Sequence, residues 1–182
     1  MAEPLPSAPS PLNYYLGKGI LYWQGPNDAD FVDLGNAPSF ECTPKVTVLD
    51  HYSSRMGVKF KDRSVTEQVE MTVKFTLEEF TPYNLALAFL GSSNADGTIN
   101  ILDIGLIQGA LRFIGTNDVG QREQVDIPYV NVQPSSAIAF IGDKWGMLEM
   151  TGEVVGDPVT GSFGLIHPNT GGVEQTDAGI TG

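Results

Sequence analysis

The chain has 182 residues and a formal net charge of -12 at pH 7, which argues against general affinity for nucleic acid or an anionic membrane, because both require a basic surface. Its 21 glycines and 12 prolines supply many turns and only 18% of its residues are charged, so long helices are not expected and the composition indicates an all-β protein. A chain of this length is most simply one domain with a core large enough to fold alone.

Signals that would assign a compartment are mostly absent from the sequence. The single cysteine, Cys42, cannot form an internal disulfide, and there is no Asn-x-Ser/Thr glycosylation signal, which argues against a secretory history. We expect Cys42 to be a small buried side chain. Residues 1–12 contain four prolines and lack the basic start and apolar run of a signal peptide, so they predict a disordered N-terminal arm. No stretch approaches the roughly 20 apolar residues that cross a bilayer, and we expect a soluble protein.

Short apolar runs predict strands at residues 17–24 and 31–34. A third strand is expected within residues 39–49, where Pro44 indicates an edge or a bulge rather than a central position. Residues 67–77 then alternate between apolar and polar side chains, which predicts a strand with one face on the core. The apolar set is Val69, Met71, Val73, Phe75 and Leu77.

One short helix is expected after this strand. Thr81 can cap it, Pro82 suits its first turn, and Gly91 suits its exit. Its residues are apolar nearly all round, so we expect it to be buried against a sheet or shared with a neighbouring molecule.

The second half of the chain predicts further strands at residues 98–102, 106–114 and 125–132, with a bulge after Pro128. Residues 137–141 and 146–155 are expected to pair across a turn at 142–144, and a last strand is possible at 163–166. The fold class is therefore all-β: a β-sandwich or partly open barrel of roughly eight strands, with one short α-helix packed on it. The expected domain covers residues 13–155, followed by a glycine-rich C-terminal arm at 156–182.

Residue patterns typical of catalysis or metal binding are missing. The two histidines, His51 and His167, are far apart, and neither is at metal-ligand spacing from a suitable partner. The acidic run at 27–30 lacks the glycine and the final glutamate of a calcium loop, and residues 161–164 fall short of a nucleophile elbow. We expect no enzymatic activity, no cofactor and no metal site.

The segment around residues 53–64 is the strongest candidate for function. Four of the chain's ten basic residues lie in nine positions here, with Met56, Val58 and Phe60 between them, and apolar side chains beside cations are typical of an interface. Residues 113–182 carry nine acidic and two basic residues, so another copy of the chain offers an acidic surface. We interpret the segment as the tip or arm of a β-hairpin, and expect residues 50–64 to be mobile in the free subunit. The predicted interaction residues are Arg55, Met56, Lys59, Phe60, Lys61 and Arg63.

The order of these features resembles the major tail tube proteins of long-tailed, non-contractile bacteriophages. The resemblance covers residues 13–155. It rests on the early strand at 16–22, the Phe-Val-Asp-Leu-Gly-Asn element at 31–36, a long polar mid-chain loop, the alternating strand, the short helix and a β-rich second half. It implies a β-sandwich subunit that assembles, commonly as six-membered rings, into a stacked hollow tube through which the genome passes.

The same resemblance implies a virion protein that is assembled in the host cytoplasm and located in the tail. Its partners would be further copies of itself and other tail proteins: the tape measure, the terminator and the distal tail protein. DNA would pass through the tube without specific binding. Related tubes occur in contractile tails and in type VI secretion, so the sequence leaves the kind of machine open.

Two alternatives from other classes are also compatible with the sequence. One is a carbohydrate-binding β-sandwich, in which Tyr14, Tyr15, Tyr22 and Trp23 would stack on sugar rings, although aromatic residues in or beside an apolar strand are more often part of a core. The other is a different virion protein, such as a tail terminator or a capsid decoration protein, which would stop at a single ring or bind the capsid.

Overall fold

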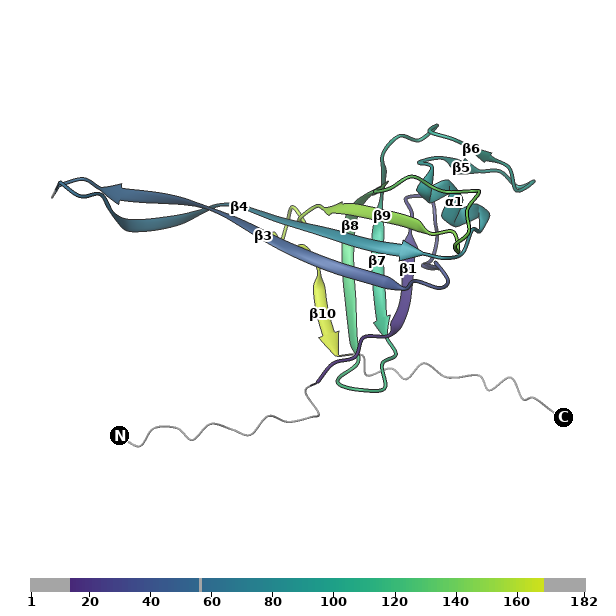
Figure 1. Ribbon diagram of the computed structural model, residues 1–182, viewed down its shortest axis with the longest axis horizontal. Coiled ribbons are helices and arrows are strands. Elements are labelled where there is room, and N and C mark those ends of the chain that lie inside the picture. Colours follow the sequence, from purple (N-terminus) through teal and green to yellow (C-terminus); the bar gives the residue numbers. More distant parts are fainter. Residues whose placement is uncertain (1–13, 56, 169–182) are drawn as a thin grey trace.

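The computed structural model describes residues 14–55 and 57–168, and these form an all-β fold with one short helix (Figure 1). The elements in chain order are β1 (Gly19–Gln24), β2 (Val32–Asp33), β3 (Ser39–Ser53), β4 (Phe60–Leu77), α1 (Pro82–Ala88), β5 (Ser92–Ser93), β6 (Ile99–Asn100), β7 (Ile107–Gly115), β8 (Glu123–Pro134), β9 (Leu148–Val154) and β10 (Leu165–Pro168). The expected fold class is confirmed.

Eight strands form one antiparallel sheet in the order β2-β1-β7-β8-β9-β4-β3, with β10 attached to β8. The first part of β8 pairs with β10 and its last part pairs with β9, so this long strand joins two differently directed halves of the sheet. Figure 1 shows β1, β7 and β8 running across the direction of β3, β4 and β9. The register between β7 and β8 shifts opposite Pro128, where a bulge was predicted.

The core lies where these two halves face each other. On β4 the alternation predicted from the sequence buries Val73, Phe75 and Leu77, whereas Val69, farther along the same strand, is about half exposed. The remaining large and fully buried side chains come from β1, β7, β8, β9 and the segment after β2: Leu21, Trp23, Leu34, Leu111, Ile127, Val130, Val132, Leu148 and Met150.

Helix α1 begins as the sequence predicted and covers one end of this core. The Asn84 backbone N–H donates a hydrogen bond to Thr81 Oγ1 (3.1 Å), and Pro82 occupies the first turn. The left-handed residue at its exit is Leu90 (φ 49°) rather than Gly91. Gly91 is required for another reason: a Cβ there would lie 1.8 Å from the carbonyl oxygen of Asn100.

The expected hairpin between residues 137–141 and 146–155 is wrong. β9 pairs with β4 along one edge and with β8 along the other, so no edge is left for residues 137–141. Residues 135–147 instead form a loop that connects β8 to β9 and exposes Phe140, Ile141 and Trp145.

The expectation for Cys42 is also wrong, because its side chain is exposed. Cys42 lies on β3, which ends the sheet and therefore has a neighbouring strand on one side only. The edge position predicted from Pro44 is confirmed, but the register shifts of β3 with β4 occur at Thr47/Val48 and His51/Tyr52.

The two expected arms are only partly described. The N-terminal arm at 1–12 lies outside the described residues, as does 169–182 of the C-terminal arm. Within residues 156–168, Phe163 packs against the core and β10 pairs with the first residues of β8, close to the strand expected at 163–166.

Candidate functional site

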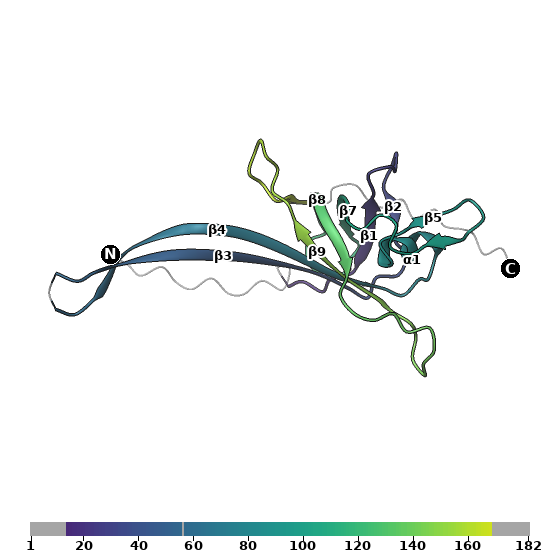
Figure 2. The same ribbon diagram turned by 90° about the horizontal axis from the view of Figure 1, so that it is seen from above.

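A two-stranded arm projects from the body of the molecule. β9 accompanies β4 only from Leu77 to Met71, and beyond that point β4 pairs with β3 alone, from Lys45–Glu70 to Ser53–Phe60. We call residues 45–70 the arm. Nine residues of β3 at about 3.3 Å each give it a length of roughly 30 Å. Figures 1 and 2 show that it extends away from all other elements.

The prediction of a hairpin arm at this position is confirmed, but the long polar loop expected over residues 50–64 is not. The strands continue to Ser53 and from Phe60, which leaves a turn at 54–59 with Gly57 in the left-handed region (φ 80°). The sequence does indicate strands here through its valines at positions 46, 48, 65 and 69, because valine favours strands. The two register shifts interrupt the alternation of apolar and polar residues, so the strand pattern cannot be recognised from the sequence.

Both faces of the arm carry exposed apolar side chains. Val46 lies opposite Val69, and Leu49 lies opposite Val65. The two pairs are on opposite faces because Val46 and Leu49 are three residues apart on β3, and the register shift at Thr47/Val48 takes up the extra residue on β4. Eight large apolar side chains of the arm are between 49% and 76% exposed: Val46, Val48, Leu49, Tyr52, Val58, Phe60, Val65 and Val69. A ribbon of two strands has no interior of its own, so these side chains stay open to water in the single subunit.

The four predicted basic residues have different roles. Lys61 Nζ forms an ion pair with Asp50 Oδ1 (2.8 Å), and the Ser64 hydroxyl donates to the same carboxylate oxygen (2.6 Å). The hydrogen bond from Lys61 is the main reason why the pKa of Asp50 is lowered, and Asp50 in turn raises the pKa of Lys61. Lys61 therefore joins the two strands of the arm.

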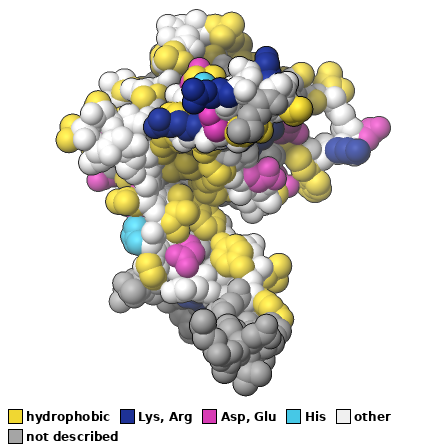
Figure 3. Space-filling view, turned by 90° about the vertical axis from the view of Figure 1, so that its left-hand side faces the viewer, with side chains coloured by type: hydrophobic (Ala, Val, Ile, Leu, Met, Phe, Trp, Pro, Cys, Tyr) yellow, Lys and Arg dark blue, Asp and Glu magenta, His cyan; other side chains and the backbone are white. Residues whose placement is uncertain are grey.

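Arg55, Lys59 and Arg63 are exposed and have no ion pair with any residue in the described ranges. Of the other charged side chains of the arm, Lys45 pairs with Glu70 (2.7 Å), Asp62 contacts His51 (2.6 Å), and Glu67 has no ion pair with any residue in the described ranges. Lys and Arg side chains gather around the tip in Figure 3, where the arm points toward the viewer. Phe60 is half exposed beside them, and Met56 lies outside the described residues.

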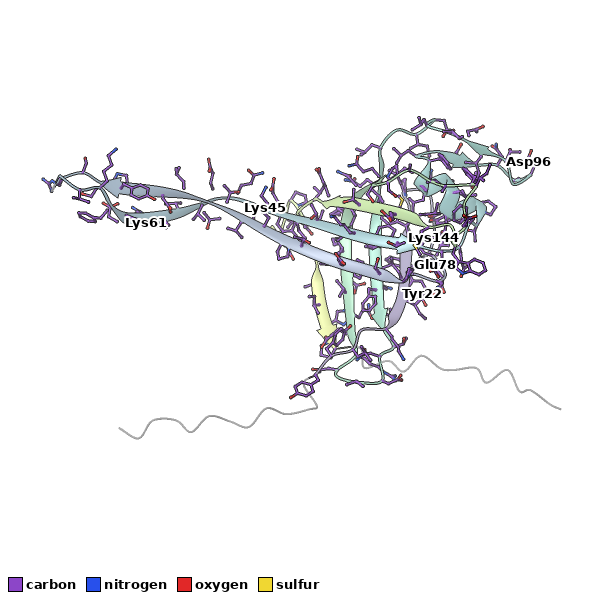
Figure 4. The ribbon with its side chains drawn as sticks, in the orientation of Figure 1. Tyr22, Lys45, Lys61, Glu78, Asp96 and Lys144 are labelled. Atoms are coloured by element: carbon purple, nitrogen blue, oxygen red, sulfur yellow. The ribbon has the colours of Figure 1, made fainter. Side chains whose placement is uncertain are left out.

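The other end of β4 is acidic. Glu78 and Glu79 follow its last residue; the backbone N–H of Asn36 donates to Glu79 Oε1 (2.9 Å) and its side-chain amide donates to Glu78. Figure 4 places Lys61 on the arm and Glu78, with Lys144 near it, at the opposite end of the strand. The two ends of β4 therefore carry opposite charge. We call the end with Arg55, Lys59 and Arg63 the tip, and the end with Glu78 and Glu79 the acidic rear.

The β8–β9 loop, residues 135–147, lies beside this acidic rear. It encloses an open concavity of about 1040 Å³ against Phe80. Trp145 at its rim is 90% exposed, and a smaller hollow lies between Trp145, Phe80 and Glu78. Sequence reasoning missed this surface because it assigned residues 137–141 to a strand.

The polar cluster around Asp126 holds strands together. Asp126 accepts from Arg112 Nε (2.5 Å) and contacts His167 Nε2 (3.0 Å), which ties β10 to β8, and Arg112 lies over the Phe31 ring (4.2 Å from its centroid). Burial raises the pKa of Asp126, but the hydrogen bonds from Arg112 and His167 outweigh it and leave the pKa lowered. Within residues 14–55 and 57–168, no group of three or more His, Cys, Asp and Glu side chains is placed to hold a metal ion.

The aromatic residues suggested for sugar stacking do not form one platform. Trp23 is in the core at 1% exposure, and Tyr22, its neighbour on β1, points to the other face. Only Tyr14 and Tyr15 of the four are largely exposed.

No helix in the described part of the chain is long and apolar enough to span a membrane.

Comparison with known proteins supplies a family. No curated protein matches the chain. A family model described as "Protein of unknown function UCP028589" matches residues 14–104, which is half of the 182 residues and includes β1, the whole arm and α1. The chain therefore belongs to the family described as "Protein of unknown function UCP028589".

Proposed function

We propose that this protein is a structural subunit that polymerises with copies of itself, and that the polymer is the tail tube of a long-tailed bacteriophage. The arm is the observation that carries the proposal. It exposes apolar side chains on two faces and ends in three cations that have no ion pair within the described residues, on a protein of net charge -12. Burying one half-exposed Val, Leu or Phe side chain contributes about 1 kcal/mol, so eight of them can support a stable contact.

The arm favours a head-to-tail contact between copies. Two arms packed tip to tip would place Arg55, Lys59 and Arg63 against the same cations of the partner, and like charges in contact repel. Tip against acidic rear removes that repulsion. Because the two surfaces differ, each bound copy leaves one of each free, so the contact repeats and builds rings or filaments.

A conduit for DNA fits the charge of the molecule. An acidic wall repels phosphates, so the polymer slides past without binding, and the net charge of -12 supports that role. In this proposal the subunits form stacked rings, commonly of six, in the virion tail, and contact the tape measure, terminator and distal tail proteins at the ends of the tube.

Electron microscopy of the concentrated purified protein, together with light scattering, tests the proposal. Long hollow filaments are expected. A stable monomer would contradict it, and discrete single rings would favour a tail terminator instead.

A charge-reversal pair tests the role of the arm. Arg55→Glu with Lys59→Glu should leave the fold intact, as seen by circular dichroism, and abolish filaments. Lys61 is kept, because its loss would weaken the arm itself. The charge control is Lys18→Glu with Lys74→Glu on the body, which gives the same net charge of -16, from -12 minus 4. Lys18 pairs with Asp118 on the surface, where an ion pair contributes little to stability, and circular dichroism checks that the control keeps its fold. Filaments from the control and none from the arm variant are expected; equal assembly of both would refute the role of the arm.

A further inference from the structure

We infer that the arm tip of one copy docks in the concavity behind the β8–β9 loop of the next copy. This inference rests on the proposed function and names the surface that receives the arm. We call that surface the seat; it consists of Glu78, Phe80, Phe140, Trp145, Met147 and Glu149.

The seat is a formed hollow with an aromatic lining. Phe140 stacks on Phe89 (6.1 Å between centroids, 6° between planes) and meets Phe80 edge to face (6.2 Å, 80°). These contacts fix the floor of the concavity. Trp145 and Phe140 are nevertheless 90% and 69% exposed, so large apolar area remains open to water.

The chemistry of the tip matches this lining. Val58 is 76% exposed between Arg55 and Lys59, which presents one apolar side chain flanked by two cations. Val58 can pack on the aromatic floor, and an arginine or lysine over an exposed Trp145 ring gains a cation–π contact.

Charge favours the same pairing. Glu78, Asp143 and Glu149 line the two hollows with one base, Lys144, among them, and none of the three carboxylates is ion-paired within the described ranges. The tip brings two or three cations to this local excess of negative charge.

The position of the seat identifies its occupant as a second copy. Lys61 on the arm and Glu78 at the seat lie at opposite ends of β4 (Figure 4), and the arm points away from the body in both ribbon views. A molecule cannot place its arm in its own seat. Because the tip and the seat lie at opposite ends, every copy has one surface that inserts and one that receives, as a repeating contact requires.

Trp145→Ala tests the seat without disturbing the core, because the side chain is almost fully exposed. We expect an unchanged melting temperature and a drop of roughly tenfold or more in the association constant measured by sedimentation, since an interface tryptophan commonly contributes over about 1.4 kcal/mol. Trp145→Phe should restore most of the affinity, and Ile141→Ala, at a side chain 97% exposed on the same loop but outside the concavity, is the control.

Mixing two defective variants gives a sharper result. The arm variant (Arg55→Glu, Lys59→Glu) keeps its seat, and the seat variant (Trp145→Ala, Glu78→Lys) keeps its arm. Neither should polymerise alone, whereas an equimolar mixture should form one arm–seat joint and stop at mixed pairs, or at paired rings. In a Cys42→Ser background, Val58→Cys in the seat variant, which keeps its arm, and Gly142→Cys in the arm variant, which keeps its seat, should then be linked by a short bismaleimide. Gly142 lines the concavity and has open space for a side chain.

These outcomes separate failure of the inference from failure of the proposed function. If the arm variant fails to assemble while the seat variant assembles normally, the seat is wrong and the assembly proposal stands. A cross-link from the tip to a different surface has the same meaning. If the arm variant itself assembles like the wild type, the role of the arm is refuted and the seat inference with it. If the wild-type protein does not assemble, the proposed function is refuted.

Discussion

Single ion pairs decide which cations of the arm are available to a partner. Lys61 forms an ion pair with Asp50, whereas Arg63, two residues farther along β4, has no ion pair in the described structure. The sequence predicted four equivalent cations because the partner of each depends on the register between β3 and β4. Asp50 lies between the two register shifts, and the second shift separates it from Lys61. Residue type alone does not show which lysine faces a carboxylate across a ribbon.

The Lys61–Asp50 pair should be visible in a pH titration. In the folded protein the pKa of Asp50 is lowered, so the stabilisation from this pair is present above the unfolded value and is lost as the pH falls through the folded value. Lys61→Met should raise the pKa of Asp50 toward its ordinary value, as measured by NMR of the side-chain carboxyl carbon. Lys59→Met, at a lysine without an ion pair in the described part of the chain, should leave it unchanged. An equal shift in both variants would show that the Lys61–Asp50 pair does not form in solution.

Gly91 should be intolerant of any side chain. Its Cβ would collide with the backbone oxygen of Asn100, and backbone cannot move aside as a flexible side chain can. Gly91→Ala should therefore destabilise the protein by about 1–3 kcal/mol in urea denaturation. Gly142→Ala, where nothing lies within 4 Å, is the control and should change stability by less than about 0.5 kcal/mol. Similar effects at both positions would mean that α1 and β6 are not packed this closely.

At the scale of elements, β4 has two functions along one continuous strand. Its last residues form core between β3 and β9, and its first residues form the arm. Regular alternation in residues 67–77 predicted the core part, and capping chemistry predicted α1. The arm strands and the β8–β9 loop were not assigned correctly, because bulges hide the period of two and because a single sequence does not show which strands occupy the edges of β9.

Two phenylalanines on β4 should separate folding from assembly. Phe75 is 1% exposed in the core, and Phe75→Ala should cost about 3–5 kcal/mol of unfolding free energy in urea denaturation. Phe60, half exposed on the arm, should tolerate the same change within about 0.5 kcal/mol but lose assembly. If Phe60→Ala polymerises at the wild-type critical concentration, the apolar faces of the arm are not part of the contact.

At the scale of the whole molecule, two electrostatic effects act on assembly in opposite directions. Subunits of net charge -12 repel one another over long distances, while tip and seat attract in contact. Salt screens charges separated by more than about 10 Å at 0.1 M, but screens partly buried pairs much less.

Raising the salt concentration from about 10 to about 100 mM should therefore lower the critical concentration for filaments, because it removes the repulsion between whole subunits before it weakens the contact between tip and seat. Replacing Arg55, Lys59 and Arg63 by glutamine should raise the critical concentration at every salt level and keep the downward trend. Sedimentation of filaments across a salt series measures both, and strongest assembly at the lowest salt would show that the attraction between tip and rear dominates at long range instead.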